Sequence, residues 1–502
     1  MKKSKVFLLA TVGLLSVGVL TACSSSSKTS GKTYNYVYGG DPATLDYVST
    51  NKKNMTTAVS NGVDGLFEND QYGNLKPSVA ENWSVSQDGL TYTYKIRKGV
   101  KWYTSDGEEY ANVTAKDFVT GLKHAADTNS EAIYLLQNSV KGLNDYLSGA
   151  NKDFSNVGIK AVDDYTLQYT LSQPEPYWNS KLTYSVTWPV NEDFLKSKGK
   201  DFGKSTDPTS ILYNGPYLLK SLTTKSSIEF TKNENYWDKD NVYFDTVKLT
   251  YDDGTDQESL ERNFTDGVYN LARLYPTSSN YSKVKKQYKD NIFYTQPGAA
   301  VEGVGVNIDR QTYDHTSKEN DQQKTSTKTA LLNKDFRQAL GFAIDRTNYA
   351  AQLNGKEGGS TAVRNIFVKP DFVQADGKDF GTMVMDQLPA YGDEWSGVNL
   401  ADSQDGLYNP EKAKAEFAKA KEALQAEGVQ FPIHLDVPVN QSNKIFVNQV
   451  QSLKQSIESA LGKDNVVLDL HQLSTDDFYN ITYSASNAAA EDWDLSVGVA
   501  WE

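Results

Sequence analysis

The chain has 502 residues, of which 38% are hydrophobic and 23% charged, and its formal net charge is −13. This length corresponds to about three domains. The composition is that of a soluble globular protein, which excludes a wholly disordered chain and a protein with many membrane spans. The acidic balance argues against non-specific nucleic-acid binding, because such binding needs a basic face. Four well-separated histidines argue against a zinc site, and a single cysteine excludes an intramolecular disulfide.

Tyrosine is unusually common, with 31 residues against 19 phenylalanines and 8 tryptophans. A tyrosine ring has an apolar face and a polar tip, which suits an adaptable and hydrated binding surface. The same residues also fit exposed strands, so both interpretations stay open at this point.

The N-terminus predicts export and membrane anchoring. Three lysines among the first five residues precede an apolar run at residues 6–20, which is too short to span a bilayer and is typical of a signal peptide. The run ends in Leu20-Thr21-Ala22-Cys23, which resembles the lipobox of bacterial lipoproteins and implies lipidation of Cys23. We therefore expect residues 1–22 to be a signal peptide and residues 23–33 to be the lipidated cysteine and a flexible tether. The mature protein should then stand on the outer face of the cell membrane.

The first half of the chain is rich in strand patterns. Alternating runs predict strands at residues 34–38, 90–96, 165–171, 228–231 and 247–251. Helix signals are fewer. Residues 61–68 carry apolar side chains at helical spacing and predict a helix, and Thr114 with Asp117 forms a capping box that predicts a helix start.

The last third alternates between helices and strands. Helices are predicted after the N-cap residues Asn333 and Asn409, and a third is predicted at residues 446–461. Strands are predicted at residues 433–439, 466–470 and 494–501. This order predicts an α/β arrangement. The polar stretch at residues 310–329 is predicted to be a surface loop. Because the sequence stops at a strand without a covering element, we expect it to be a fragment.

Known catalytic and nucleotide-binding motifs do not fit the sequence. Gly31-Lys32-Thr33 lacks the first glycine of a P-loop, and Gly303-Val304-Gly305 lacks the third glycine of a dinucleotide-binding loop. In residues 252–256 the glycine comes too early for a calcium loop, so Asp256 is interpreted as the N-cap of a helix through Leu260. A glycosidase would use two carboxylates distant in sequence, so this class of enzyme stays open.

Six stretches taken together resemble one family of binding proteins. They are residues 79–92, 97–102, 113–119, 214–217, 232–238 and 333–346. In this order they resemble the bacterial extracellular solute-binding proteins of family 5, the peptide/nickel-binding family. Within that family the sequence is most similar to the streptococcal Ami-type oligopeptide-binding lipoproteins of ABC transporters.

The resemblance implies an α/β, two-lobed periplasmic-binding-protein-like fold of type II, in its three-domain peptide-binding variety, with an incomplete C-terminal part. Residues 34–60 and 187–272 would form domain I in the first lobe, residues 61–186 an inserted domain II, and residues 273–502 the second lobe. The implied function is capture of oligopeptides between the lobes and their delivery to an ABC permease and its ATPases. The protein would be a membrane-anchored monomer that is not an enzyme and takes no cofactor, metal or nucleic acid.

The resemblance also implies a set of peptide-binding residues. They are Ser49, Thr50, Asn51, Lys52, Lys53, Asn54, Tyr134 and Trp501. Trp501 matches the tryptophan of a Gly-Trp-x-x-Asp segment of the family. Here Ala500 takes the place of the glycine, and the acidic residue of that segment would fall beyond Glu502.

Three alternatives stay open. A receptor of the same fold could bind nickel, haem or an oligosaccharide, although few histidines and one cysteine argue against the metal. The second alternative is a surface glycoside hydrolase. The third is an adhesin or a sensor of signalling peptides, a role that a binding protein can also have.

Overall fold

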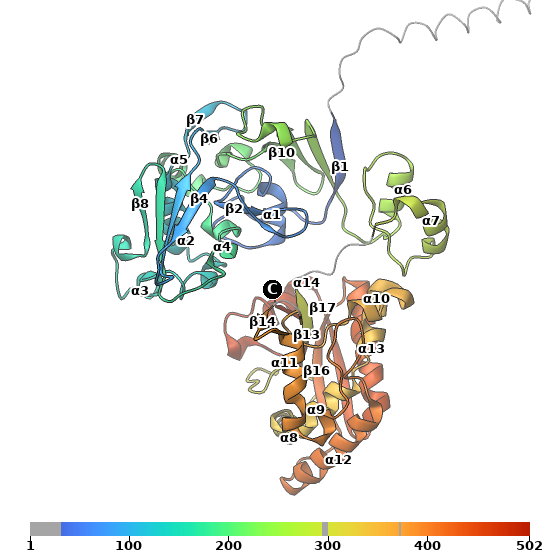
Figure 1. Ribbon diagram of the computed structural model, residues 1–502. Coiled ribbons are helices and arrows are strands. Elements are labelled where there is room, and N and C mark those ends of the chain that lie inside the picture. The colour runs from blue at the N-terminus through green and yellow to red at the C-terminus, as the bar shows by residue number, and fades with distance from the viewer. Residues whose placement is uncertain (1–31, 294–299, 371–372, 502) are drawn as a thin grey trace, which may run out of the picture. The chain divides into compact units, whose positions relative to one another are not determined.

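The computed structural model describes residues 32–293, 300–370 and 373–501 (Figure 1). The chain divides into two compact units, of which unit 1 ends at Arg273 and unit 2 begins at Leu274. Each unit has a hydrophobic core of its own. Within the described residues, no helix combines the length and apolar character needed to cross a membrane. Cys23, the predicted lipidation site, lies outside the described residues.

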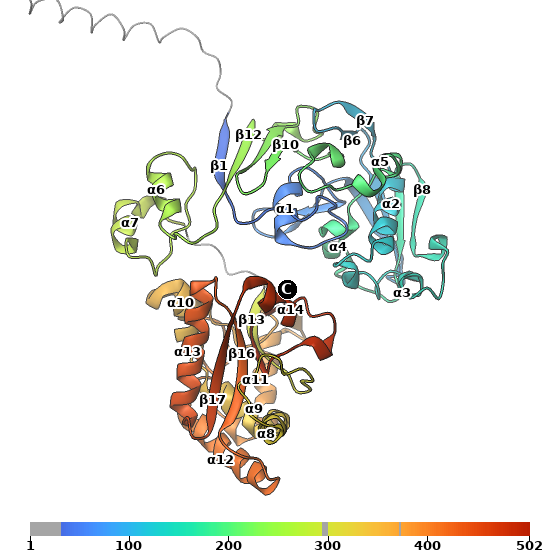
Figure 2. The same ribbon diagram turned by 180° about the vertical axis from the view of Figure 1, so that it is seen from behind.

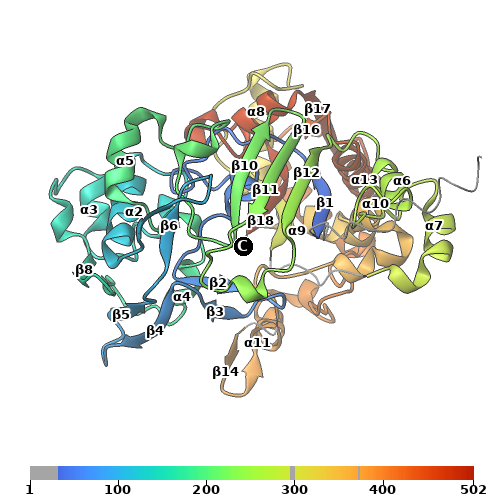
Figure 3. The same ribbon diagram turned by 90° about the horizontal axis from the view of Figure 1, so that it is seen from above.

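Unit 1 contains a four-stranded sheet in the order β1, β12, β11, β10 (Figure 3). β1 (Thr33–Tyr38) pairs in parallel with β12 (Thr246–Tyr251), and β11 (Ser227–Lys232) pairs antiparallel with both β12 and β10 (Tyr217–Thr223). The three strands predicted in these regions are confirmed. The parallel pairing of β1 and β12 joins the first described strand to the last strand of the same unit.

A second four-stranded sheet of unit 1 has its own helix. Its strands, in spatial order, are β4 (Ala80–Val85), β5 (Thr91–Ile96), β9 (Thr166–Thr170) and β8 (Ile159–Asp163). Helix α2 (Ala115–Asp127) packs against β8 and β9, and its first turn has the predicted capping box. The strands predicted at residues 90–96 and 165–171 are confirmed. Tyr94 and Tyr169 pack edge to face in the core. Some of the many tyrosines therefore belong to the core and not to a binding surface.

The helix predicted at residues 61–68 is wrong. The helix in this part of the chain is α1 (Lys53–Val59), and residues 61–66 have no regular structure. They lead into a hairpin of β2 (Phe67–Asn69) and β3 (Leu75–Pro77).

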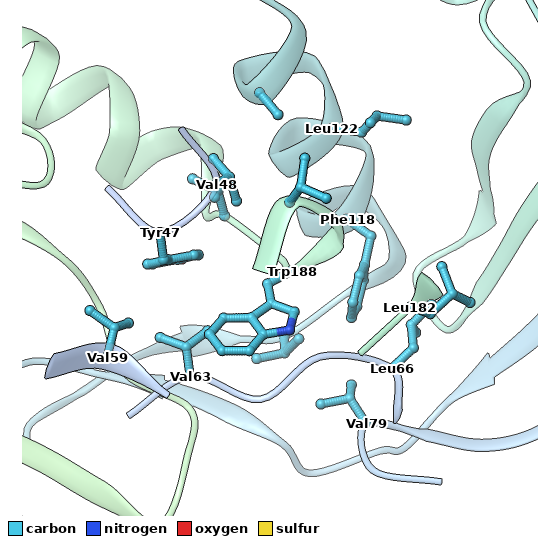
Figure 4. Close-up of a cluster of buried hydrophobic side chains, with 14 of the residues drawn as sticks. Tyr47, Val48, Val59, Val63, Leu66, Val79, Phe118, Leu122, Leu182 and Trp188 are labelled. Carbon is cyan, nitrogen blue, oxygen red and sulfur yellow. The ribbon is translucent and has the colours of Figure 1, made fainter. Parts of the chain in front are cut away.

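Residues 61–66 cross the hydrophobic core as irregular chain. Figure 4 shows Val63 and Leu66 among the buried side chains around Trp188. A Cβ at Gly65 would lie 2.6 Å from the Trp188 ring, so this close approach requires glycine. The apolar spacing that predicted a helix is therefore the spacing of core contacts along an irregular segment.

Short elements complete unit 1. They are β6 (Lys101–Tyr103), β7 (Glu109–Asn112), α3 (Leu143–Leu147), α4 (Trp178–Lys181), α5 (Glu192–Lys198) and α6 (Ser259–Thr265). The N-cap position of α6 is Glu258, so the assignment of that role to Asp256 is wrong. The Asp256 carboxylate instead accepts a hydrogen bond from the Glu258 amide at 3.0 Å and pairs with Arg262, which closes a turn before the helix.

Unit 2 is built on a βαβ motif. β16 (Ile433–Asn440) and β17 (Val466–Leu473) are parallel, and α13 (Lys444–Leu461), which connects them, packs on both strands (Figure 2). β13 (Val301–Val306) pairs antiparallel with β18 (Leu495–Trp501). The predicted strands and the α/β arrangement of this third are confirmed.

Helices cover the motif at the positions that the capping residues predict. α9 (Lys334–Ala343) follows Asn333, α12 (Pro410–Ala426) follows Asn409, and these two helices pack against each other. Both asparagine side chains accept a hydrogen bond from the third helical amide at 3.0 Å. The other elements are α7 (Tyr281–Gln287), α8 (Asp321–Leu332), α10 (Arg346–Gly358), β14 (Gln374–Ala375), β15 (Lys378–Asp379), α11 (Phe380–Gln387) and α14 (Thr475–Ile481).

The prediction of a polar surface loop at residues 310–329 is wrong. Helix α8 begins at Asp321, and the side chains of Arg310 and Lys318 are only 2% and 0% exposed. Arg310 lies 2.6 Å from Asp436 and 2.7 Å from Asp492, and Lys318 lies 2.7 Å from Asp436. Both cations also pair with Asp494. These two cations and three carboxylates form the buried ion cluster of unit 2.

Candidate functional site

The loop that connects β1 to α1 in unit 1 contains four of the predicted site residues, Ser49 to Lys52, and the other two, Lys53 and Asn54, begin α1. Several residues of the loop contact Glu131. The Ser49 carbonyl accepts a hydrogen bond from the Glu131 amide at 3.0 Å. The Thr50 hydroxyl donates to the Glu131 carboxylate, and Lys52 Nζ lies 3.1 Å from Glu131 Oε1. The loop is thereby joined to a segment 81 residues further along the chain.

Glu131 is a charged group at neutral pH. Burial raises the pKa of its carboxyl, but the hydrogen bonds from Thr50 and Lys52 together hold this pKa below its ordinary value. About half of the Lys52 and Glu131 side chains is exposed, so their ion pair is worth about 1 kcal/mol or less. A ligand that brings its own charged group can therefore open the pair at little cost.

A cavity of about 300 Å³ lies at this contact. Its lining residues are Ala43, Thr44, Ser49, Thr50, Lys52, Met55, Thr128, Asn129 and Glu131. Hydroxyl, amide and charged groups line one part of the cavity and a methionine and an alanine the other. Such a cavity offers hydrogen-bond donors and acceptors beside a small apolar surface, which suits a ligand with both kinds of group.

The other predicted residues of unit 1 lie beside the cavity rather than in its lining. Asn51 is exposed on the same loop, and Lys53 and Asn54 are exposed at the start of α1. Tyr134 lies on the turn after Glu131 with 58% of its surface exposed. The structure thus places the loop residues and Tyr134 on adjoining segments. The sequence did not predict Glu131, because its pairing with the loop depends on a distant contact.

A buried pair supports the loop from behind. His124 Nε2 lies 2.8 Å from Asp46 Oδ2, and the Ser49 hydroxyl donates to the Asp46 carbonyl at 2.9 Å. The Asp46 backbone also lies against Gly203, where an added Cβ would clash at 2.3 Å. These contacts hold the loop in one conformation and so pre-form the cavity.

Unit 2 has a second candidate surface at the carboxyl edge of β16 and β17, where open α/β sheets commonly bind ligands. Helix α14 follows β17 at this edge. The Tyr483 hydroxyl, just after α14, donates to the Gly498 carbonyl of β18, so the end of β18 lies at the same edge. The backbone of Trp501, the predicted site residue of this unit, pairs there with Val301.

Aromatic side chains cover this edge. Tyr479 and Tyr483 have ring centroids 5.8 Å apart and are 45% and 51% exposed. Phe478 packs beneath them and contacts Phe446 at the start of α13. Exposed tyrosines on a packed aromatic base form a rigid surface with polar tips, which suits recognition of varied side chains.

Two further observations limit the possible sites. A cavity of about 360 Å³ lies between the β1–β12–β11–β10 sheet and the end of α1, is lined by aromatic and apolar residues together with Thr57, Ser60 and Asn61, and contains none of the predicted site residues. Among the residues that the structure describes, no three His, Cys, Asp or Glu side chains are grouped so that they could hold a metal ion.

Comparison with protein families identifies a match over most of the chain. The family model for bacterial extracellular solute-binding proteins, family 5 (middle region), matches residues 74–501. The oligopeptide-binding protein AmiA of Streptococcus pneumoniae is 68% identical over 504 residues, which cover 100% of this chain and 76% of that protein. The oligopeptide-binding protein SarA of Streptococcus gordonii is 61% identical over 509 residues, which cover 100% of this chain and 77% of that protein.

Solved structures share the fold. OppA of Listeria monocytogenes bound to peptide superposes with a TM-score of 0.67 at 23% identity, over 94% of this chain and 81% of that chain. The substrate-binding domain of an oligopeptide ABC transporter from Bacillus anthracis superposes with a TM-score of 0.68 at 22% identity, over 94% of this chain and 79% of that chain.

Proposed function

Because the chain belongs to the bacterial extracellular solute-binding proteins of family 5, we propose that it captures oligopeptides outside the cell and delivers them to an ABC permease with its ATPases. The observation that carries this proposal is the identity of 68% and 61%, over the whole chain, to two proteins named oligopeptide-binding. The family consists of binding proteins rather than enzymes.

The chemistry of the unit 1 cavity supports this ligand class. Different peptides share a backbone, so a receptor for many peptides gains affinity from main-chain contacts and from hydrated, adaptable side-chain pockets. Ser49 and Thr50 offer hydroxyl and backbone groups, and Lys52 and Glu131 offer one charge of each sign. Together with Asn51, Lys53, Asn54, Tyr134 and Trp501, they form the proposed peptide-binding set.

We also propose the domain division that the resemblance implies. Domain I comprises residues 34–60 and 187–272, an inserted domain II comprises residues 61–186, and the second lobe begins at residue 273. The β1–β12–β11–β10 sheet draws its strands from the first set and the β4–β5–β9–β8 sheet from the second, which supports this division.

The anchor is part of the proposal. Lipidation of Cys23 would hold a monomeric receptor at the outer face of the membrane, close to its permease. Replacing Cys23 by alanine is expected to release the protein into the culture medium, as measured by immunoblotting of membrane and medium fractions. Retention of the variant in the membrane fraction would contradict the anchor.

Peptide binding is tested directly on the full-length protein. Native mass spectrometry of the purified protein should detect bound peptides, and calorimetry should record heat with mixed hexapeptides but not with oligosaccharides, haem or Ni²⁺. Binding of only one of these other solutes would overturn the proposal. Thr50→Ala combined with Lys52→Ala should weaken peptide binding about tenfold, because two polar contacts are lost. Lys324→Ala, at a partly exposed position on helix α8 of unit 2, is the control.

A further inference from the structure

Glu302 is an unpaired carboxylate at the aromatic edge of unit 2. It is the second residue of β13, and its backbone pairs with that of Ala500 near the end of β18. Its side chain is exposed and makes neither a hydrogen bond nor an ion pair within the part of the chain that the structure describes. Some other exposed acids of the unit, such as Glu357 with Lys285, do have cationic partners.

Tyrosines lie in the neighbourhood of this residue. Glu302 pairs with Ala500, two residues after Gly498, whose carbonyl accepts the hydrogen bond from the Tyr483 hydroxyl. In agreement with this neighbourhood, burial and then the negative charge of Glu302 raise the pKa of both Tyr349 and Tyr483. Tyr479 stands beside Tyr483 with a centroid distance of 5.8 Å. Glu302 is therefore close to a group of tyrosines that come from α10 and from the segment around α14.

The local backbone fixes these rings. Gly498 has a φ of +82°, at an irregularity in the pairing of β18 with β13, and only glycine adopts this conformation without strain. Its carbonyl accepts the hydrogen bond from the Tyr483 hydroxyl. Because that hydroxyl is already bonded, Tyr483 offers a ligand mainly its ring. A ring face and an unpaired carboxylate both attract a cation, the first through its quadrupole and the second through its charge.

We propose that Glu302, Tyr479 and Tyr483 form a subsite that binds a positively charged group of the peptide, either a lysine or arginine side chain or the N-terminal ammonium. This inference rests on the proposed function. Its location supports it, because the subsite lies at the edge where β18 carries Trp501 and where α/β sheets bind ligands. The unpaired charge of Glu302 favours a cation over an apolar side chain as the occupant.

The test is a set of alanine-based hexapeptides whose affinities are measured by calorimetry on the full-length protein. One arm carries a single lysine at each position in turn, a second replaces that lysine by norleucine, and a third acetylates the N-terminus. We expect one lysine peptide to bind about tenfold more tightly than its norleucine counterpart. If the ammonium is the recognised group, acetylation causes the loss instead.

Matched variants assign the preference to Glu302. Glu302→Gln should reduce the cationic preference to about twofold or less, since only the ring contacts remain, and should leave the norleucine affinity unchanged. Glu422→Gln, which changes an exposed acid on α12, should keep the full preference. Tyr479→Ala should reduce the preference in part, and Tyr483→Phe, which keeps the ring, should retain it.

The outcomes separate this inference from the proposed function. Wild-type protein that binds peptides but shows the same cationic preference as Glu302→Gln would overturn the subsite and leave the proposed function intact. A preference for norleucine over lysine at every position would also overturn it, because the occupant would then be apolar. If the wild-type protein bound none of the peptides, the proposed function and the subsite would fall together.

Discussion

Two buried acids of unit 1 differ from the acids in the buried ion cluster of unit 2. Unit 1 buries Asp64 and Asp117 without a cation: Asp64 accepts a hydrogen bond from Tyr236 at 2.7 Å, and Asp117 accepts one from the Thr114 amide at 2.7 Å. Burial raises the pKa of Asp64 to about 7 and that of Asp117 to about 6. Unit 2 instead buries three carboxylates together with Arg310 and Lys318.

This difference decides which protonation state each unit needs. A buried acid with only neutral donors is stabilised when it carries its proton, whereas a buried acid beside cations is stabilised when it is ionised. In unit 2, burial raises the pKa of Asp436, but the hydrogen bond from His471 and the charge of Lys318 outweigh this and hold it far below its ordinary value. The two units should therefore respond to pH with opposite signs.

The largest expected effect comes from breaking the ion cluster. Arg310→Met should destabilise unit 2 by about 3–5 kcal/mol, because it leaves buried carboxylates without a counter-charge. Unit 1 should keep its stability. Urea titration followed by pulsed hydrogen exchange and mass spectrometry measures the units separately. Lys328→Met, which breaks only an exposed pair with Asp309, should cost about 1 kcal/mol or less. Equal losses in the two variants would contradict a structural role of the cluster.

The second effect is a loss of stability in unit 1 as the pH rises. The pKa of Asp64 is about 7 in the folded state against an ordinary 3.8, so the folded state binds more protons between these values. The stabilisation is complete below about pH 4 and is lost as the pH passes 7, with a total of about 4 kcal/mol. Urea titrations at pH 4 to 8, each followed by hydrogen-exchange labelling at one common pH, measure this loss of unit 1 stability.

Two variants check the assignment to Asp64. Asp64→Asn should reduce the slope of unit 1 stability against pH, most clearly between pH 6 and 7, because Asp117 still titrates up to about pH 6. Glu81→Gln, which changes an exposed acid of the same unit, should leave the slope as it is. An unchanged slope in Asp64→Asn would assign the pH dependence to other groups.

A third effect has the opposite sign and belongs to unit 2. The folded-state pKa of Asp436 lies below its unfolded value, so its contribution is present above about pH 4 and is lost on acidification. By pH 2 the loss should reach about 2–3 kcal/mol. The same labelling experiment between pH 5 and 2 should show unit 2 unfolding at a lower urea concentration. A constant midpoint for unit 2 over this range would refute the sign.

The smallest effect should be alike in the two units. Thr114→Ala in unit 1 and Asn409→Ala in unit 2 each remove a helix N-cap and should each cost about 1 kcal/mol. Urea midpoints of the affected unit measure the loss. Similar costs would show that the contrast between the units lies in their buried charges and not in their local helix signals. A cost several times larger in one unit would contradict this, because the units would then differ in their local helix signals as well.

The sequence predicted the elements whose signals are local. The capping box at Thr114, the N-caps Asn333 and Asn409 and the alternating strands were identified correctly, because their determinants lie within a few residues. Residues 310–329 were misread because the counter-charges of Arg310 and Lys318 lie more than 100 residues away. The helix predicted at residues 61–68 failed for a related reason, since those apolar residues contact distant core groups.

In the candidate site, too, residues that depend on distant contacts could not be predicted from the sequence. The resemblance pointed to Ser49, Thr50 and Lys52, and the structure places these three around one cavity. Glu131, which lies in the same lining, has no recognisable motif around it, so only the folded chain reveals it. Glu302 was not singled out in the sequence, because its tyrosine neighbours come from two other segments.

The parallel pairing of β1 with β12 also bears on biosynthesis. The Lys32 amide bonds to the side chain of Asp245, 213 residues further along the chain, at the start of this pairing. At usual synthesis rates the partner strand appears about 10–40 s after β1. Until then β1 has an open edge that other chains can join. Unit 1 therefore cannot complete its first sheet until β12 has been synthesised, and a nascent chain that ends before Tyr251 leaves β1 without its full partner.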